Sequence, residues 1–386
     1  MSVAGLIRLQ QGLAQLKAEH LHRRRRVLDG AQGAHVTLDG RRVVSFCSNE
    51  YLGLAADPAL VAAAHAALDQ CGVGAGAAHL ITGHHRFHDD FETAFARFVG
   101  KPAALLFSTG YLANLGVLTA LAGKKGELFA DKLNHASLVD AAQLSGARFH
   151  RYRHLDLAQL EGQLAASTAA DKLIVSDLVF SMDGDVAPID ALLDLAERYD
   201  AWLYLDDAHG FGVLNGGRGG LTERARASER VIYLATLGKA AGVAGAAVAA
   251  HADVIDWLVQ KARPYVYTTA SPPLLAACLL ESLRQIEAGG ARRERLQRHV
   301  AQLRAGLVDL KGAALMASDT PIQPLVVGAN EEAVRLSQAL LERGLMVPAI
   351  RPPTVPANTA RLRITLSAAH SEADVSALVE ALHALV

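Results

Sequence analysis

The chain has 386 residues, of which 51% are hydrophobic and 20% are charged, and its formal net charge is −1 at pH 7. This composition is typical of an ordinary folded protein, and without a basic excess it gives no indication of nucleic-acid binding. The length suits a large domain together with a smaller one. The three cysteines, Cys47, Cys71 and Cys278, lack metal-type or disulfide-type spacing, which favours a reducing compartment.

The N-terminal region predicts a helix followed by a basic run. Residues 2–21 place apolar side chains at helical spacing. They show no basic start before a long apolar core, and no later segment has 18 clean apolar residues, so we expect a cytoplasmic protein without membrane contact. Residues 22–26 have the sequence HRRRR. Such a run indicates either a solvated surface or a contact with phosphate or carboxylate groups.

A glycine-rich segment, GVGAGAAHLITG, occupies residues 72–83. A helical pattern precedes it and no GK[ST] follows, so neither a dinucleotide site nor a P-loop is indicated. His84, His88 and Asp89 come next, at spacings that a metal ion could use. The same residues also suit the first turn of a helix, where an acidic group faces the helix dipole, and we favour that interpretation.

The segment 103–122 predicts a short strand, AALLFSTG, joined directly to a helix, YLANLGVLTALA. Gly110 and Tyr111 fall at the junction, where free backbone N–H groups and the helix dipole can bind an anion. Tyr111 could equally be an aromatic residue that packs on the core at the start of the helix. His135, in NHASL, precedes another predicted helix, but in a chain with 16 histidines its position alone indicates no function.

Two predicted strands end in reactive side chains. Residues 201–212, AWLYLDDAHGFG, carry Asp206 and His209 at the end, and residues 231–248, VIYLATLGKAAGVAGAAV, change at Lys239 to a glycine- and alanine-rich run. A buried lysine loses proton affinity and can act as a nucleophile or base near neutral pH, although a lysine that closes a strand is often simply solvated. Because parallel α/β sheets bind ligands beyond the carboxyl ends of their strands, these groups can face one pocket.

The remaining segments complete a β-α-β alternation. Residues 172–189, KLIVSDLVFSMDGDVAPI, predict a strand and a turn, with Ser181 at the end of the strand, and a helix then leads into the strand of Asp206. This alternation indicates a mostly parallel sheet. Near the C-terminus, Arg351 lies beside two prolines that stiffen its backbone, and arginine suits bidentate carboxylate binding. Arg361 and Arg363 alternate in a predicted strand and are interpreted as structural.

A lysine, a carboxylate and an imidazole at separate strand ends suit pyridoxal phosphate (PLP). This cofactor needs a Schiff-base lysine and a carboxylate for its pyridinium nitrogen. The linked motifs DDAHGFG, TLGK and FSMDGDVAP resemble the α-oxoamine synthases among the fold-type I PLP-dependent enzymes. The resemblance covers about residues 20–375. It implies an α/β fold with three parts: an N-terminal helix and arm (1–45), a large PLP-binding domain with a mostly parallel sheet (46–283) and a small α/β C-terminal domain (284–386).

The resemblance also implies residue roles. Lys239 would hold PLP through a Schiff base and act as the base, Asp206 would pair with the pyridinium, and His135 would stack on the ring. Thr268 and Thr269 would contact the phosphate of a neighbouring subunit in a homodimer. Further cofactor contacts would be Gly110, Tyr111, Ser181, His209 and Thr236, and further substrate contacts would be Arg23, Asn49, Arg351 and Thr354.

Within the family, IRPPTVP at residues 350–356 most resembles the biotin-pathway members. These condense L-alanine with a pimeloyl thioester, carried on coenzyme A or on a carrier protein, with loss of CO2. A family member that uses glycine with acetyl- or succinyl-coenzyme A is the first alternative. A non-catalytic scaffold is the second, and the presence of both Lys239 and Asp206 argues against it.

Overall fold

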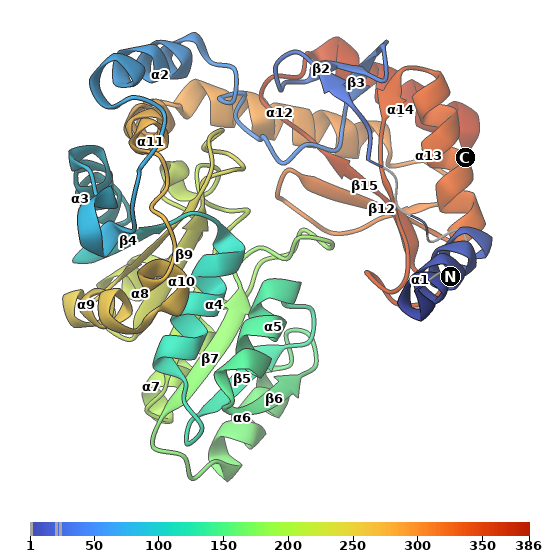
Figure 1. Cartoon of the computed structure of the whole chain (residues 1–386). Coiled ribbons are helices and arrows are strands. Elements are labelled where there is room, and N and C mark those ends of the chain that lie inside the picture. The colour runs from blue at the N-terminus through green and yellow to red at the C-terminus, as the bar shows by residue number, and fades with distance from the viewer. Residues whose placement is uncertain (1–2, 20–21, 23–24) are drawn as a thin grey trace.

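A seven-stranded sheet forms the centre of the larger lobe in the computed structural model, which describes residues 3–19, 22 and 25–386 (Figure 1). Its order is β4-β10-β9-β8-β7-β5-β6. The strand β10 runs antiparallel to both neighbours, and the other pairs are parallel. The strands are β4 (Ala103–Phe107), β5 (Glu127–Asp131), β6 (Arg148–Tyr152), β7 (Lys172–Asp177), β8 (Trp202–Asp206), β9 (Val231–Thr236) and β10 (Ala246–Ala250).

Both faces of this sheet are covered by helices, which explains why the central strands are apolar throughout. In β9, Tyr233 enters the core on one face, and Ile232 and Leu234 enter the core on the other. One face packs against α4 (Gly110–Leu121), α5 (Ala136–Ser145), α9 (Ala252–Lys261) and α10 (Arg263–Val266). The other packs against α3 (Arg86–Val99), α6 (Leu157–Ala166), α7 (Ile189–Arg198), α8 (Glu223–Ala227) and α11 (Pro273–Glu287).

The smaller lobe contains two further sheets and three helices. One sheet, β11-β12-β15-β14, is antiparallel, and the other has the order β1-β2-β3-β13. The strands are β1 (Leu28–Asp29), β2 (His35–Leu38), β3 (Arg41–Ser45), β11 (Ala314–Leu315), β12 (Ile322–Gly328), β13 (Leu345–Met346), β14 (Ala349–Ile350) and β15 (Ala360–Thr365). The helices are α12 (Gly290–Gly306), α13 (Asn330–Glu342) and α14 (Glu372–Leu385). Because β3 pairs with β13, residues 28–45 share a sheet with the C-terminal part; the two boundaries between the three predicted parts remain a prediction.

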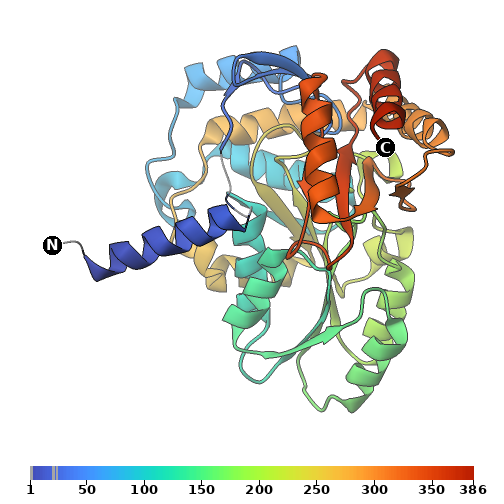
Figure 2. The ribbon, with the colours of Figure 1, turned by 90° about the vertical axis from the view of Figure 1, so that its right-hand side faces the viewer.

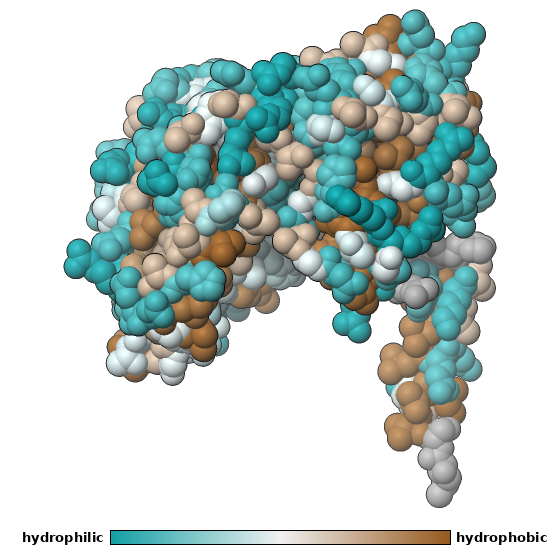
Figure 3. Space-filling model, turned by 90° about the horizontal axis from the view of Figure 1, so that it is seen from above, coloured by the Kyte–Doolittle hydropathy of each residue, from teal (hydrophilic) through white to brown (hydrophobic). Residues whose placement is uncertain are grey.

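The N-terminal helix α1 (Ala4–Ala18) extends away from both lobes (Figure 2). None of its side chains is buried, and its leucines at positions 6, 9, 13 and 16 are exposed. Seen from above, apolar side chains gather along an arm that projects from the body (Figure 3). Among the described residues, no helix combines the length and the apolar character needed to cross a membrane.

The two lobes meet at the loop of residues 181–185, which follows β7. Arg361 of β15 donates to the carboxylate of Asp183 at 2.7 Å, and Arg363 donates from Nε to the carbonyl of Ser181 at 2.6 Å. Ser318 Oγ donates to the carbonyl of Gly184 at 2.8 Å. The loop is therefore held from the small lobe while it borders the carboxyl edge of the large sheet. The short segments that complete the chain are α2 (Pro58–Cys71), the π-helix η1 (His79–Gly83) and the 3-10 turn η2 (Asn215–Gly217).

Candidate active site

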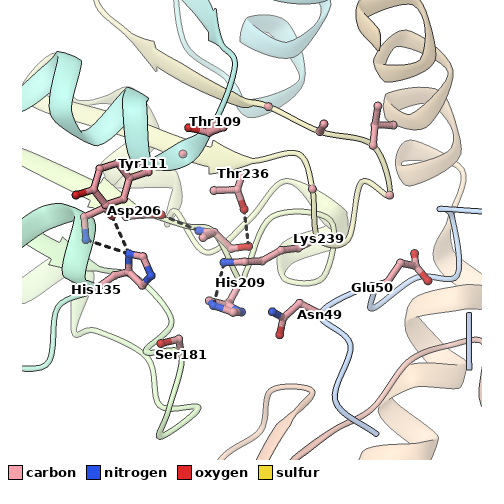
Figure 4. Close-up of a pocket in the computed structure, with 18 of the residues that line it drawn as sticks. Asn49, Glu50, Thr109, Tyr111, His135, Ser181, Asp206, His209, Thr236 and Lys239 are labelled. Carbon is pink, nitrogen blue, oxygen red and sulfur yellow. Dashed lines mark hydrogen bonds between the residues drawn. The ribbon is translucent and has the colours of Figure 1, made fainter. Parts of the chain in front are cut away.

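A cavity of about 780 Å³ lies at the carboxyl edge of the seven-stranded sheet. Strands β8 and β9 and the turns after β4, β5 and β7 supply its wall, and the segment 48–50 closes it from the small-lobe side (Figure 4). The structure places most of the predicted cofactor residues here. The predicted residues that line it are Asn49, Gly110, Tyr111, His135, Ser181, Asp206, His209, Thr236 and Lys239.

Lys239 follows the end of β9 and points into the cavity toward His209 (Figure 4). Its Nζ atom lies 3.0 Å from His209 Nε2. Burial lowers the pKa of Lys239 to about 8, although the carboxylates of Asp206 and Asp177 act in the opposite direction. The lysine therefore offers a free amine at mildly alkaline pH, as a nucleophile or a base requires.

Asp206, at the end of β8, is a buried carboxylate that is 3% exposed. It accepts hydrogen bonds from Asn114 Nδ2 at 2.8 Å and from the backbone N–H of Ala208 at 3.0 Å. Tyr204 in turn donates to Asn114 Oδ1 at 2.6 Å and so fixes the amide. Among the described residues, the hydrogen bonds to this carboxylate come from neutral donors. The sequence did not identify Asn114 or Tyr204 as site residues. They lie inside a predicted helix and a predicted strand, where no motif distinguishes them.

His135 precedes α5, and hydrogen bonds of its backbone and its ring fix its position. Its N–H donates to Asp177 Oδ2 at 2.6 Å, and its Nδ1 lies 2.7 Å from Ser137 Oγ. Burial lowers the pKa of His135, with Asp206 opposing that shift and Lys239 adding to it. Burial and the nearby Asp206 carboxylate raise the pKa of Asp177 well above its ordinary value. The ring of His135 is therefore a neutral, fixed face beside Asp206.

The N-terminus of α4 forms the opposite end of the cavity. Thr109 caps the helix by accepting from the N–H of Leu112 at 3.1 Å, and Gly110 begins it. A Cβ on Gly110 would lie 2.6 Å from Thr236 Cγ2, so glycine permits this close approach. The first turn of an α-helix leaves backbone N–H groups free, and Gly110 and Tyr111 of this turn line the cavity, as anion binding requires. Tyr111 is 43% exposed and donates to Asp140 Oδ2 at 2.6 Å, so it does not pack in the core.

Arg363 of β15, in the small lobe, contacts two residues that line the cavity, Ser181 and Asn49, although it is not itself a lining residue. Its Nη1 and Nη2 atoms both lie 3.2 Å from Asn49 Oδ1, and its Nη1 lies 3.1 Å from Thr365 Oγ1. These acceptors and the Ser181 carbonyl are all neutral. Arg361, two residues earlier, is instead paired with Asp183. Of these two buried arginines, only Arg363 keeps a positive charge beside the cavity without a carboxylate partner.

Four other predicted residues do not line the cavity in the described chain. Arg351 and Thr354 lie beyond β14, where Arg351 is half-buried and Thr354 is exposed. Thr268 and Thr269 follow α10 at the surface of the larger lobe. Arg23 lies outside the described residues. The roles suggested for these five residues stay predictions.

The histidines near the glycine-rich segment form a cluster. Ligand atoms of His79, His84 and His88 lie within 4.8 Å of one another. However, His88 Nδ1 accepts from the N–H of His85 at 2.9 Å, and its Nε2 lies 2.9 Å from the carbonyl of Ser271. Both ring nitrogens of His88 are thus engaged in capping α3 and fixing a loop. This geometry agrees with the predicted helix start rather than with a metal site.

Comparison with known proteins shows the family of this chain. Residues 41–382 match the family model for aminotransferase class I and II. The chain is 80% identical over 385 residues to 8-amino-7-oxononanoate synthase from Thiobacillus denitrificans, with 100% of each chain covered. Among solved structures, serine palmitoyltransferase from Sphingomonas wittichii superposes with a TM-score of 0.91 at 31% identity, covering 99% of this chain and 96% of that one. A structure of SPT with PLP gives the same TM-score and coverage at 29% identity.

The chain belongs to the aminotransferase class I and II family, and the predicted fold is confirmed. Within that family, curated relatives that match it over nearly its whole length are 8-amino-7-oxononanoate synthases, which confirms the family resemblance found in the sequence.

Proposed function

We propose that this chain acts as a PLP-dependent 8-amino-7-oxononanoate synthase. It joins L-alanine to a pimeloyl thioester and releases CO2 and the free thiol carrier. The observation that carries this proposal is the placement of Lys239 and Asp206 at the ends of adjacent strands in one cavity, in a chain 80% identical to such an enzyme.

The residues of the cavity fit PLP at three points. Asp206 has only neutral donors among the described residues, so a pyridinium nitrogen would supply the missing positive partner. The first turn of α4, at Gly110, offers free N–H groups to a phosphate, with Thr236 beside it. Lys239 offers the amine for covalent attachment. When bound, PLP supplies an electron sink that stabilises negative charge at the α-carbon of the amino acid.

Lys239 is the base of the proposed reaction. Its lowered pKa of about 8 leaves a useful fraction of free amine near neutral pH, and the same group can return a proton later. His209 holds the Nζ atom in position at 3.0 Å. His135 provides one wall, and its backbone bond to Asp177 prevents that wall from moving. Burial of these groups excludes water, which strengthens their mutual electrostatic effects.

The carboxylate of the amino acid needs a cation, and the structure adds a candidate to the predicted Arg351. Arg363 has a buried guanidinium whose described acceptors are all neutral, and it lies beside Asn49 at the cavity. A carboxylate could pair with it bidentately and would offset the cost of its burial. We therefore assign carboxylate binding to Arg363. Arg351→Lys and Arg363→Lys separate the two candidates through the KM for L-alanine.

A second copy of this chain completes the proposed enzyme. Val73 and Ile81 of the glycine-rich segment and Tyr267 beside α10 are 74%, 76% and 72% exposed. The two segments are joined by a bond from the N–H of Ala270 to the carbonyl of Ala77 at 2.9 Å. Such an exposed apolar group is typical of a subunit interface. Thr268 lies in the same segment, so a homodimer would bring its hydroxyl toward the neighbouring cavity.

Two further parts of the proposal concern the acyl donor and the compartment. Arg23, in the basic run, would contact the acyl donor, whose thiol carrier is coenzyme A or a carrier protein. The three free cysteines agree with a reducing cytoplasm.

An assay of the purified, PLP-loaded chain tests the proposal. L-alanine or glycine would be combined with acetyl-, succinyl- and pimeloyl-thioesters, and products would be identified by mass spectrometry. We expect product from L-alanine with the pimeloyl thioester. Faster turnover of glycine with acetyl- or succinyl-coenzyme A would show that the chain is instead a family member that uses those substrates. No turnover of any pair would favour a non-catalytic scaffold.

A further inference from the structure

Tyr51 lies in the segment CSNEYLGL, residues 47–54, two residues after Asn49, and it connects His209 to the small lobe, a contact that the sequence did not predict. The side chain is fully buried. Its hydroxyl lies 2.6 Å from His209 Nδ1 and 3.3 Å from Asn49 Oδ1. His209 Nε2 in turn lies 3.0 Å from Lys239 Nζ. A continuous hydrogen-bond chain therefore runs from Asn49 through Tyr51 and His209 to the lysine.

The backbone around Tyr51 is fixed from both sides. The carbonyl of Tyr51 accepts from the N–H of Ala368 at 2.8 Å, and the carbonyl of Glu50 accepts from Ser367 Oγ at 2.7 Å. Glu50 Oε1 also accepts from the N–H of Leu54 at 2.6 Å. The hydroxyl of Tyr51 is consequently presented to His209 by a rigid segment and does not depend on a mobile loop.

The chain of hydrogen bonds permits two arrangements of its protons. When Lys239 is an ammonium, it donates to His209 Nε2, Nδ1–H donates to the Tyr51 oxygen, and the Tyr51 O–H donates to Asn49. When Lys239 is a neutral amine, the Tyr51 O–H donates to Nδ1, and Nε2–H donates to the lysine nitrogen. The second arrangement holds one proton fewer, which Lys239 has lost, and the imidazole proton has moved from Nδ1 to Nε2. In both arrangements, each ring nitrogen of the buried His209 has a hydrogen-bond partner, as buried polar groups require.

We propose that Tyr51 is a positioning residue that keeps His209 complementary to Lys239 in both charge states of the lysine. A hydroxyl can do this because it both donates and accepts. An ammonium, which only donates, or a carbonyl, which only accepts, could serve one tautomer of His209 but not the other. This positioning role of Tyr51 does not depend on which acyl donor the enzyme uses.

The surroundings of His209 and Tyr51 keep both side chains uncharged. Burial, with the positive charges of Lys239 and Arg363 adding to it, lowers the pKa of His209 well below its ordinary value, so the ring changes tautomer without becoming charged. Burial raises the pKa of Tyr51 to about 12, so its hydroxyl keeps its proton. The titratable and charged groups that face Lys239 are Asp206, Asp177, Asp207, His135, His209 and Arg363.

Tyr51→Phe tests the proposal because it removes the hydroxyl and keeps the ring. The first arrangement would then leave Nδ1–H as a buried donor without an acceptor, which is less tolerated than an unpaired acceptor. His209 should therefore stay in the Nε2–H tautomer, and the ammonium form of Lys239 should be disfavoured. Since one buried hydrogen bond is lost, the proton affinity of Lys239 should fall by about three- to tenfold.

Two measurements on the full-length chain freed of cofactor check this expectation. Nitrogen-15 spectra of labelled histidine, with His209 assigned by His209→Gln, report the tautomer on either side of the lysine titration. The pH dependence of amine labelling at Lys239, followed by peptide mass spectrometry, reports its proton affinity. Tyr152→Phe is the matched control, because Tyr152 is as deeply buried as Tyr51 but its hydroxyl is bonded to Ser176 and not to His209.

We expect the wild type and Tyr152→Phe to change from the Nδ1–H to the Nε2–H tautomer as Lys239 loses its proton. Tyr51→Phe should show Nε2–H throughout and an altered labelling profile. The proposal is overturned if Tyr51→Phe behaves as the wild type, or if Tyr152→Phe shifts the lysine equally. Neither measurement uses turnover, so a failure here would be distinct from a failure of the proposed function.

Discussion

Lys239 Nζ lies 3.0 Å from His209 Nε2, although the two residues come from the ends of different strands, β9 and β8. Parallel pairing of these strands brings both ends to one edge of the sheet. Burial at that edge lowers the pKa of Lys239 to about 8, which turns an ordinary strand-end lysine into a reactive amine.

Covalent attachment of PLP should occur at Lys239 and at no other lysine. Borohydride reduction of the PLP-loaded chain should label the peptide of Lys239, and Lys239→Ala should lose the label. Lys101 is a useful comparison, because burial also lowers its pKa to about 8. It donates to the carbonyls of Ala225 and Ser228 and does not line the cavity, so it should remain unlabelled. Labelling of Lys101 in place of Lys239 would refute the assignment.

Asp206→Asn should reduce turnover by about 10²–10³-fold, as expected when a single electrostatic contact to the developing charge is removed. The amide keeps the shape of the side chain and removes the negative charge that would hold the pyridinium proton. PLP should still bind, because Lys239 and the first turn of α4 remain. Steady-state kinetics and cofactor absorbance would check both points. Turnover close to that of the wild type would mean that Asp206 only caps the turn at Ala208.

The sequence predicted the large sheet because its strands are continuous apolar runs at regular intervals between helices. It did not predict that Ala246–Ala250 would form the antiparallel strand β10, because alanine is a poor strand former. That strand is set by its neighbours β4 and β9. The predicted helix at residues 2–21 is seen as α1 over Ala4–Ala18.

At the site, the sequence located the groups that end strands, such as Asp206 and Lys239, since topology alone brings them together. It could not locate residues whose role depends on distant partners. Asn114 is 92 residues from Asp206, Tyr51 is 158 residues from His209, and Arg363 is 314 residues from Asn49. No local pattern records such contacts. From the sequence, Arg363 is interpreted as structural because it alternates with Arg361 in a predicted strand.

Mixed dimers should recover activity if the cavity is completed by a second subunit. One chain would carry Lys239→Ala and the other Thr268→Ala with Thr269→Ala. If the threonines act across the interface, both lesions fall in one cavity and the other cavity is intact, so part of the activity returns. Adding PLP should also raise the melting temperature and the dimer fraction, by mass action. Confirmed mixed dimers without recovered activity would reject the shared cavity.

His154 should stabilise the fold in a pH-dependent way. Burial disfavours its charged form, but the carboxylates of Asp131 and Asp185 outweigh burial and raise its pKa to about 10, from 6.5 in the unfolded chain. Because its pKa is raised on folding, His154 stabilises the folded state fully below pH 6.5, and this stabilisation is lost as the pH rises through about 10. His154→Gln should therefore cost about 2 kcal/mol near neutral pH and less at high pH.

Melting temperatures of the wild type and His154→Gln across this pH range check that prediction. Arg153→Gln is the control, since Arg153 is 72% exposed in its ion pair with Asp156 and should matter little at any pH. A difference between His154→Gln and the wild type that does not change with pH would show that the ring acts only by packing.

The coupling of CO2 release to thiol release tests the central claim most directly. The PLP-loaded chain would be given L-alanine labelled in its carboxyl carbon together with a pimeloyl thioester, and labelled CO2 and free thiol would be measured over time. The account predicts equal amounts of both from the wild type and neither from Lys239→Ala. Thiol released without labelled CO2, or equal release by Lys239→Ala, would contradict it.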